Sequence, residues 1–315
     1  MRKLILAVLV VTFSASGALG QSQSAPTLRI VSENGNTLPS ELMYGNTRVK
    51  PLRLRPGTNQ PITIDDSDFF VQQQYVDFLS RFPDQAGFGF WTNEIAVCGA
   101  NVACIDNKRV NVSAAFFLSI EFQQTGYLVY RLNKAAFGNL AGKPVPVTRA
   151  SFMPDTRQIG QGVVVGAPGA DALLEANKVA FINGFVTRGP FVALYPQGMA
   201  AATYVDTLFS KAGVTPTAAE RQNAINAYGA GDTAGRAAAL RSVAESQTLQ
   251  QAESNKAFVL MQYFGYLQRD PDAAPDLNFD GYNFWLGKLN QFNGNFVNAE
   301  MVKAFIVASE YRGRF

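Results

Sequence analysis

The feature that most constrains the fold of this chain is a landmark sequence that occurs twice. Residues 75–84, YVDFLSRFPD, and residues 263–272, YFGYLQRDPD, share Tyr, Leu, Arg, Pro and Asp at matching places. Further along, AGFGFW at 86–91 matches DGYNFW at 280–285. Such self-similarity indicates one structural unit used more than once. A unit this small must bury its apolar face against its copies.

The two copies differ in the spacing between landmarks. The third match pairs AFFLSIEF at 115–122 with AFIVASEY at 304–311. The offset is 188 at the first match, 194 at the second and 189 at the third, so the second copy has gained six residues and the first copy five. The six lie within AAPDLNFD, and the five lie in the stretch that carries the cysteines. The single-residue landmarks are Arg81, Pro83, Asp84, Gly87 and Trp91 in the first copy, and Arg269, Pro271, Asp272, Gly281 and Trp285 in the second.

The sequence pattern of the copies is helical. In residues 65–82 an acidic N-cap cluster precedes apolar residues at helical spacing, namely Val71, Tyr75, Phe78, Leu79 and Phe82. A fainter middle copy is indicated by YVDTLFSKAG at 204–213 and AALRSVAESQT at 238–248. We therefore predict an all-α fold of helical repeat units packed on one another.

The predicted organisation begins with a segment that is extended, partly β or disordered, because residues 21–64 are rich in Ser, Thr, Asn, Pro and Gly. The full set of predicted parts is a signal peptide (1–20), this N-terminal segment (21–64), a first helical unit (65–138), a connecting loop and helix (139–200), a degenerate middle unit (201–256) and a second clear unit (257–315).

The N-terminus has the pattern of a secretory signal peptide. Arg2 and Lys3 precede an apolar run from Leu4 to Phe13, and Ala18-Leu19-Gly20 forms a small-residue cleavage site. We expect the mature chain to start near Gln21 and to be exported, to the periplasm, the cell surface or the medium. No later segment is apolar and long enough to predict a membrane span.

Charge and residue usage limit the function classes. The signal peptide contains two of the 27 basic residues and none of the 24 acidic ones, so the mature chain is nearly neutral and gives no electrostatic reason to expect nucleic acid as a partner. The absence of histidine excludes Ser-His and Cys-His dyads. In an exported protein, the neighbouring Cys98 and Cys104 predict a local disulfide rather than a zinc site.

The landmark order resembles a known family. Tyr-x-x-Leu-x-Arg-x-Pro-Asp, then Gly-x-x-Phe-Trp, then Ala-Phe-x-x-Ser-x-Glu-Phe is similar to the bacterial domain-of-unknown-function 4214 family, over residues 69–130 and 257–315. Domains of that family occur in exported and surface-associated bacterial proteins. The resemblance therefore implies a location and an architecture, but no mechanism. The insertion before Gly281 departs from the family pattern.

The inserted loop has the opening half of an EF-hand-type calcium loop. Asp276, Asn278 and Asp280 alternate before a glycine, and Asp272 is close enough to assist. The ninth and twelfth positions are Phe284 and Gly287, which cannot ligate calcium through a side chain. The alternative is structural: Asp272 would take the turn position of Asp84, and Asp280 would cap the helix that follows.

The aromatic and arginine landmarks also allow two interpretations each. The Phe-Trp pairs at 90–91 and 284–285 could stack on sugars, but large aromatic residues at equivalent helical positions favour core packing. Arg81 and Arg269 could bind an anion, but each is expected to hold the carboxylate of its own turn.

Together these features predict a secreted, non-catalytic binding, adhesion or scaffolding protein of the cell envelope or extracellular matrix. Its expected partner is a polysaccharide or another surface protein, and calcium is its only candidate cofactor. The alternative is a secreted carbohydrate-active enzyme that uses paired carboxylates.

Overall fold

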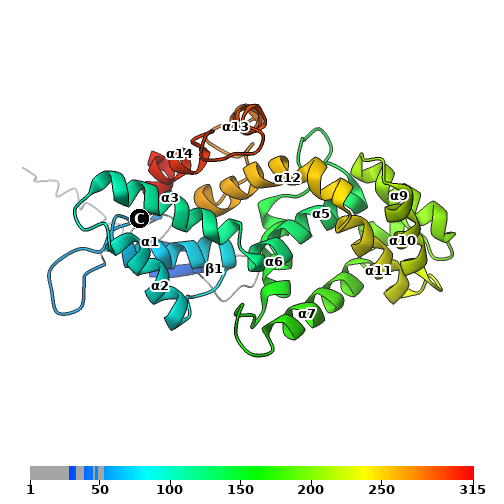
Figure 1. Ribbon diagram of the computed structural model, residues 1–315, viewed down its shortest axis with the longest axis horizontal. Helices are drawn as coiled ribbons and strands as arrows, with labels where there is room; N and C mark the ends of the chain where they lie inside the picture. Colours follow the sequence, from blue (N-terminus) through cyan, green and yellow to red (C-terminus); the bar gives the residue numbers. More distant parts are fainter. Residues whose placement is uncertain (1–27, 33–38, 45–46, 49–52) are drawn as a thin grey trace, which may run out of the picture.

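The computed structural model describes residues 53–315 and, as backbone alone, the strand residues 28–32, 39–44 and 47–48. Helices dominate the described part, which confirms the predicted all-α class (Figure 1). The molecule is elongated, with α1, α2, α3 and α14 toward one end and α9, α10 and α11 at the other. Segments at opposite ends of the sequence therefore lie together.

The helical elements of the described part are α1 (Ser67–Gln74), η1 (Tyr75–Leu79), α2 (Gln85–Ala96), α3 (Val102–Phe117), α4 (Ile120–Gln124), α5 (Gly126–Phe137), α6 (Arg149–Gly160), α7 (Ala170–Phe185), α8 (Gly189–Leu194), α9 (Ala201–Ala212), α10 (Ala218–Tyr228), α11 (Thr233–Ala244), α12 (Gln247–Gln262), η2 (Tyr263–Leu267), α13 (Asp280–Gln291), α14 (Met301–Val307) and α15 (Ser309–Arg312). The segments η1 and η2 are π-helical.

The N-terminal segment contributes a small antiparallel sheet. Its strands β1 (Leu28–Ser32), β2 (Pro39–Tyr44) and β3 (Thr47–Arg48) pair in sequence order. In this segment TLRIVSENGNTL begins with a strand-like pattern and contains an Asn34-Gly35 turn signal. The strand is present as β1, whereas the turn signal and the signal peptide (1–20) lie outside the described residues.

The first helix of each unit ends in the same way. A π-helical turn follows α1 and α12, and the next residue, Ser80 or Gln268, adopts a left-handed backbone with φ of 55° or 52°. The helix therefore stops before Phe82, whose side chain is 59% exposed. The prediction that Phe82 extends the buried face of the first helix is wrong, because the left-handed residue turns the chain away from the helix axis.

Serine caps divide the long helical stretches. Ser119 accepts the backbone N–H of Phe122 and starts α4, and Ser246 accepts that of Leu249 and starts α12. The sequence pattern predicts a long helical stretch from about Thr233 to Arg269 with a break near Ser246-Gln247, and this break is confirmed. Residues 139–200, expected to hold one helix, contain α6, α7 and α8.

Equivalent parts of the two units face each other. Helices α3 and α14 are in contact, and so are η1 and η2. Phe78 and Tyr266, which the sequence match pairs, pack edge to face at 5.0 Å between ring centroids. Arg314 stabilises this contact between the two units, because it binds both carboxylate oxygens of the buried Asp77, at 2.7 and 2.9 Å.

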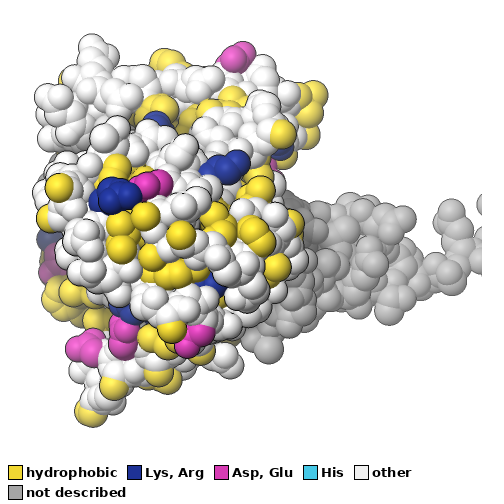
Figure 2. Space-filling view, turned by 90° about the vertical axis from the view of Figure 1, so that its right-hand side faces the viewer, with side chains coloured by type: hydrophobic (Ala, Val, Ile, Leu, Met, Phe, Trp, Pro, Cys, Tyr) yellow, Lys and Arg dark blue, Asp and Glu magenta, His cyan; other side chains and the backbone are white. Residues whose placement is uncertain are grey.

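The end of the molecule that carries α9, α10 and α11 has a mixed surface. Figure 2 shows basic and acidic side chains scattered among apolar ones on this face. Arg221 and Asp206 form an exposed pair between α10 and α9, at 2.6 Å. Opposite charges are therefore mixed on this face, and at least one pair of them is joined directly.

Candidate functional site

The landmark arginines each bind a glutamate of the closing helices. Arg81 donates Nε and Nη2 to the two carboxylate oxygens of Glu121, both at 2.8 Å. Arg269 makes the same paired contact with Glu310, at 2.5 and 3.0 Å. Such bidentate pairs fix the orientation of both side chains. The expected contact with the carboxylate of its own turn is present for Arg81, whose Nη1 lies 3.6 Å from Asp84, but Glu121 is the nearer partner.

This partner could have been found in the sequence. Glu121 and Glu310 occupy the same place in AFFLSIEF and AFIVASEY, at the offset of 189 that joins these segments. A glutamate repeated together with an arginine is a signal for an ion pair between them. The signal was missed because the two residues lie about forty positions apart, with a sequence separation of 40 in the first unit and 41 in the second.

The landmark glycines make room for a tyrosine hydroxyl. A Cβ atom on Gly87 would lie 2.2 Å from the hydroxyl oxygen of Tyr75, and one on Gly281 would lie 2.5 Å from that of Tyr263. Each arginine also lies over its tyrosine ring, at 4.9 and 5.4 Å from the ring centroid. A side chain at either position would collide with the tyrosine hydroxyl, so both units need glycine there.

The Phe-Trp pairs divide between core and surface. Trp91 packs against Phe116 at 5.8 Å, and Trp285 packs against the equivalent Phe305 at 5.7 Å. The preceding phenylalanines, Phe90 and Phe284, are 57% and 61% exposed. The interpretation of these pairs as core residues therefore holds for the tryptophans and is wrong for the phenylalanines.

A cavity of about 600 Å³ opens beside the arginine of the first unit. Its apolar wall includes Trp91 and Phe116, and its polar wall is formed by Tyr75, Arg81, Asp84 and Glu121. The cavity is also lined by residues 164–167. These belong to the glycine-rich stretch 160–170, for which the sequence pattern predicts a loop or a short strand, and they form a loop between α6 and α7. The volume is within the range of small-molecule sites.

The carboxylate of Asp84 is held in its charged form. It accepts the backbone N–H of Gly87 at 2.8 Å as the N-cap of α2. This hydrogen bond, with a weaker effect of Arg81, lowers the pKa of Asp84 below its ordinary value. Burial raises the pKa of Tyr75, so its hydroxyl stays protonated and can donate a hydrogen bond.

The inserted loop changes the polar contacts around the arginine of the second unit. Asp276 binds Arg269 at 2.8 Å and lies beside Gly281, so it takes the place that Asp84 has in the first unit. Asp272, which aligns with Asp84 in sequence, instead pairs with Lys143 at 2.6 Å. The expectation that Arg269 holds the carboxylate of its own turn, Asp272, is therefore wrong, because the insertion carries this aspartate away from the arginine.

The start of α13 also differs from expectation. Asp280 is the first helical residue rather than the N-cap. Its backbone N–H is bound by the Asn278 side-chain oxygen at 2.8 Å, and its carboxylate accepts from the Asn278 amide at 3.0 Å. Asn278 therefore supplies the local turn that had been assigned to the aspartate.

The loop side chains do not fit a calcium site in this arrangement. Asp276 and Asp272 are bound to two different cations, and Asn278 and Asp280 are bound to each other. Burial raises the pKa of Asp270, which opposes its use as a charged ligand. Within residues 53–315 no cluster of three or more acidic, cysteine or histidine side chains is placed to hold a metal ion.

We expect that excess calcium chloride leaves the thermal unfolding midpoint of the protein unchanged relative to EDTA. A ligand that binds only the folded state must raise the midpoint, and calcium would first have to displace Arg269 and Lys143 from their carboxylates. Circular dichroism melting checks this, with magnesium chloride as the control for ionic strength. A rise with calcium alone, lost in Asp276→Asn, would restore the calcium hypothesis.

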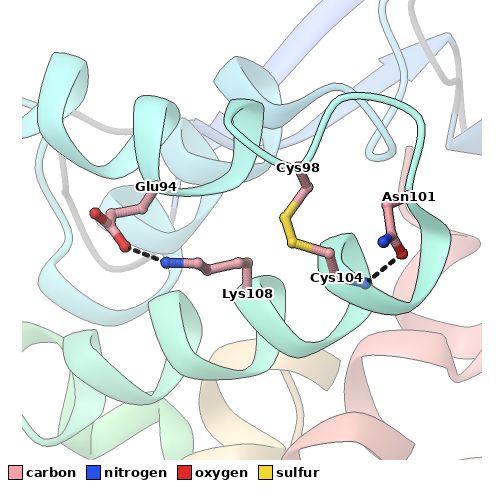
Figure 3. Close-up of a disulfide and its surroundings, with 5 residues drawn as sticks. All are labelled: Glu94, Cys98, Asn101, Cys104 and Lys108. Carbon is pink, nitrogen blue, oxygen red and sulfur yellow. Dashed lines mark hydrogen bonds and ion pairs between the residues drawn. A yellow bond between two sulfur atoms is a disulfide. The ribbon is translucent and has the colours of Figure 1, made fainter.

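The predicted disulfide is present. Cys98 and Cys104 are bonded, with their Cα atoms 5.6 Å apart, and join the end of α2 to the start of α3 (Figure 3). Asn101 caps α3 inside the loop by accepting the Cys104 backbone N–H at 3.1 Å. Lys108 and Glu94 bridge the same two helices at 2.6 Å. The first-copy insertion is therefore a closed loop that holds α2 against α3.

Comparison of the chain with protein-family models, with curated proteins and with solved structures found no match. The likeness to the domain-of-unknown-function 4214 family therefore stays a prediction from the landmark motifs. In the part of the chain that the structure describes, no helix has the length and apolarity needed to cross a membrane.

Proposed function

We propose that the protein is exported and acts as a non-catalytic binding protein, built from two copies of one helical module and a diverged middle copy. The landmark motifs of this module resemble the domain-of-unknown-function 4214 family. Support comes from contacts that recur in both copies: the π-helical turn, the left-handed residue, the arginine–glutamate pair and the glycine under a tyrosine hydroxyl.

The proposed ligand is a sugar unit of a polysaccharide, bound in the cavity beside Arg81. One observation carries this choice: the Tyr75 hydroxyl and the Asp84 carboxylate line the same cavity as Trp91 and Phe116. The Tyr75 hydroxyl has no hydrogen-bond partner within residues 53–315. A sugar offers hydroxyl groups that can bond the Tyr75 hydroxyl and the Asp84 carboxylate, and a flat apolar face that can pack against the aromatic rings.

Binding is favoured over hydrolysis by the state of the carboxylates. Asp84 and Glu121 both line the cavity, as a glycosidase pair would, but both lie against Arg81. A glycosidase needs one carboxylic acid whose pKa is raised so that it can donate a proton. The pKa of Asp84 is lowered instead, by the Gly87 N–H first of all.

Tryptophan fluorescence can test the site, because the two tryptophans occupy equivalent positions and only Trp91 lines the cavity. The mature chain is screened on a glycan array, and each bound glycan is then titrated into Trp285→Phe, in which Trp91 is the remaining reporter. We expect a saturable change in emission. The matched variant Trp91→Phe, which keeps Trp285, should show none.

A second pair of variants tests the polar wall. Asp84→Asn keeps a side chain that can cap α2 but removes the charge, and we expect it to weaken glycan binding about tenfold. Asp206→Asn, which removes an exposed carboxylate on α9, should bind as the wild type does. Equal binding by both variants would contradict this site. Capture of a surface protein without any glycan would favour the protein ligand, and release of shortened sugars would favour the enzyme.

A further inference from the structure

A second cavity, separate from the site beside Arg81, lies where α4, α5, α7, α11 and α12 meet, and its volume is about 410 Å³. Its lining is polar and basic: Arg131 from α5, Lys178 from α7 and Arg241 from α11 all contribute. Figure 1 shows α5, α7 and α11 grouped around this part of the molecule. Three positive charges around one cavity need negative charges to balance them.

Two of the three cations are balanced by protein carboxylates. Arg241 binds Glu175 at 2.9 Å through Nη2, and Glu245 at 3.0 Å through Nε. Lys178 lies 3.1 Å from Glu175 and donates to Gln124 at 2.6 Å. The contact with Arg241 lowers the pKa of Glu175 to about 2, so this glutamate is charged at neutral pH.

Arg131 has no such partner. Its Nε donates to the carbonyl oxygen of Ala244 at 2.8 Å, and its two terminal nitrogens bind no carboxylate or other acceptor among residues 53–315. Burial lowers the pKa of Arg131, and the charge of Glu245 opposes this effect without reversing it. Three cations against two glutamates leave one positive charge to be neutralised.

We propose that this cavity binds a small molecule that carries a carboxylate or a phosphate, with the oxyanion on the terminal nitrogens of Arg131. A guanidinium presents two parallel N–H groups that match either oxyanion. The rest of the lining is Leu128, the Glu245 carboxylate that Arg241 binds, and the amides of Gln123, Gln124 and Gln250. The amide groups are the lining side chains that can bond the rest of the ligand. The site is independent of the sugar site in position and in the chemistry it recognises.

Isothermal titration of the mature protein with inorganic phosphate and with sodium succinate, at constant ionic strength, tests the proposal. We expect saturable binding of at least one of them, and the two probes distinguish a phosphate ligand from a carboxylate ligand. Arg131→Lys keeps the charge but loses the paired donors, so its affinity should fall about tenfold or more. Arg221→Lys, at an exposed arginine of α10, is the matched control and should bind as the wild type does.

A second variant keeps the test decisive if Arg131→Lys folds poorly. Gln123→Glu adds a carboxylate to the lining of the same cavity without removing Arg131. It should compete with the ligand, abolish anion binding and raise the thermal midpoint. The absence of binding of both probes to the wild type would overturn the proposal, and so would unchanged affinity in Gln123→Glu.

Discussion

Replacing Glu121 with glutamine is expected to destabilise the folded protein by about 3 kcal/mol, the usual cost of breaking a buried ion pair. The Glu121 side chain is 6% exposed, and both of its oxygens accept from Arg81. Glutamine keeps one acceptor but turns an amide toward Arg81 Nη2, so two donors then face each other. Burial lowers the pKa of Arg81, but the hydrogen bonds and charge of Glu121, together with Tyr75 and Asp84, raise it above its ordinary value.

The second unit supplies the control for this substitution. Glu310→Gln breaks the equivalent pair, but Glu310 is 35% exposed and Arg269 retains the carboxylate of Asp276. We expect a loss of about 1 kcal/mol or less there, as for a solvated pair. Urea unfolding followed by circular dichroism measures both variants. Equal losses would show that burial does not distinguish the two pairs.

The helices could be predicted because their signals are local. Apolar spacing, the serine at position 246 and the repeated landmarks each act over a few residues, and the structure places the helices and the break at Ser246 accordingly. The end of the first helix could not be predicted in this way. The left-handed conformation of Ser80 leaves no mark in residue type, so Phe82 was assigned to a helix that had already ended.

The candidate site was less predictable because contacts between distant segments build it. Asp84 and Trp91 were identified as landmarks, but Glu121 reaches Arg81 from α4, and residues 164–167 close the cavity from a loop without any landmark. Because of the insertion before Gly281, the residue that aligns with Asp84 in sequence is not the one that takes its place in space. Asp276 reaches the arginine, whereas the aligned Asp272 pairs with Lys143.

A methyl group added at Gly87 is the second large effect we expect, a loss of about 2 kcal/mol in the free energy of unfolding. The Cβ of Gly87→Ala would lie 2.2 Å from the hydroxyl oxygen of the buried Tyr75, and within 3.2 Å of both Asp84 oxygens. The tyrosine ring is stiff and lies under Arg81, so it cannot swing aside freely. Gly89→Ala on the same helix meets nothing within 4 Å, and should be neutral or stabilising by up to ~1 kcal/mol.

The double variant Gly87→Ala with Tyr75→Phe decides whether the hydroxyl is the cause. Removing the oxygen gives the new methyl group its space, so the two substitutions should be non-additive and the double variant more stable than Gly87→Ala alone. Gly281→Ala should be rescued by Tyr263→Phe in the same manner, since its Cβ would lie 2.5 Å from that hydroxyl. Rescue in both units would mean that the tyrosine hydroxyl is what makes glycine necessary at the paired position. If the losses are additive, the tyrosine hydroxyl is not the cause, and in the first unit the clash lies with the Asp84 carboxylate instead. The space next to Gly87 would then set no limit on the position of the Tyr75 hydroxyl when a ligand binds.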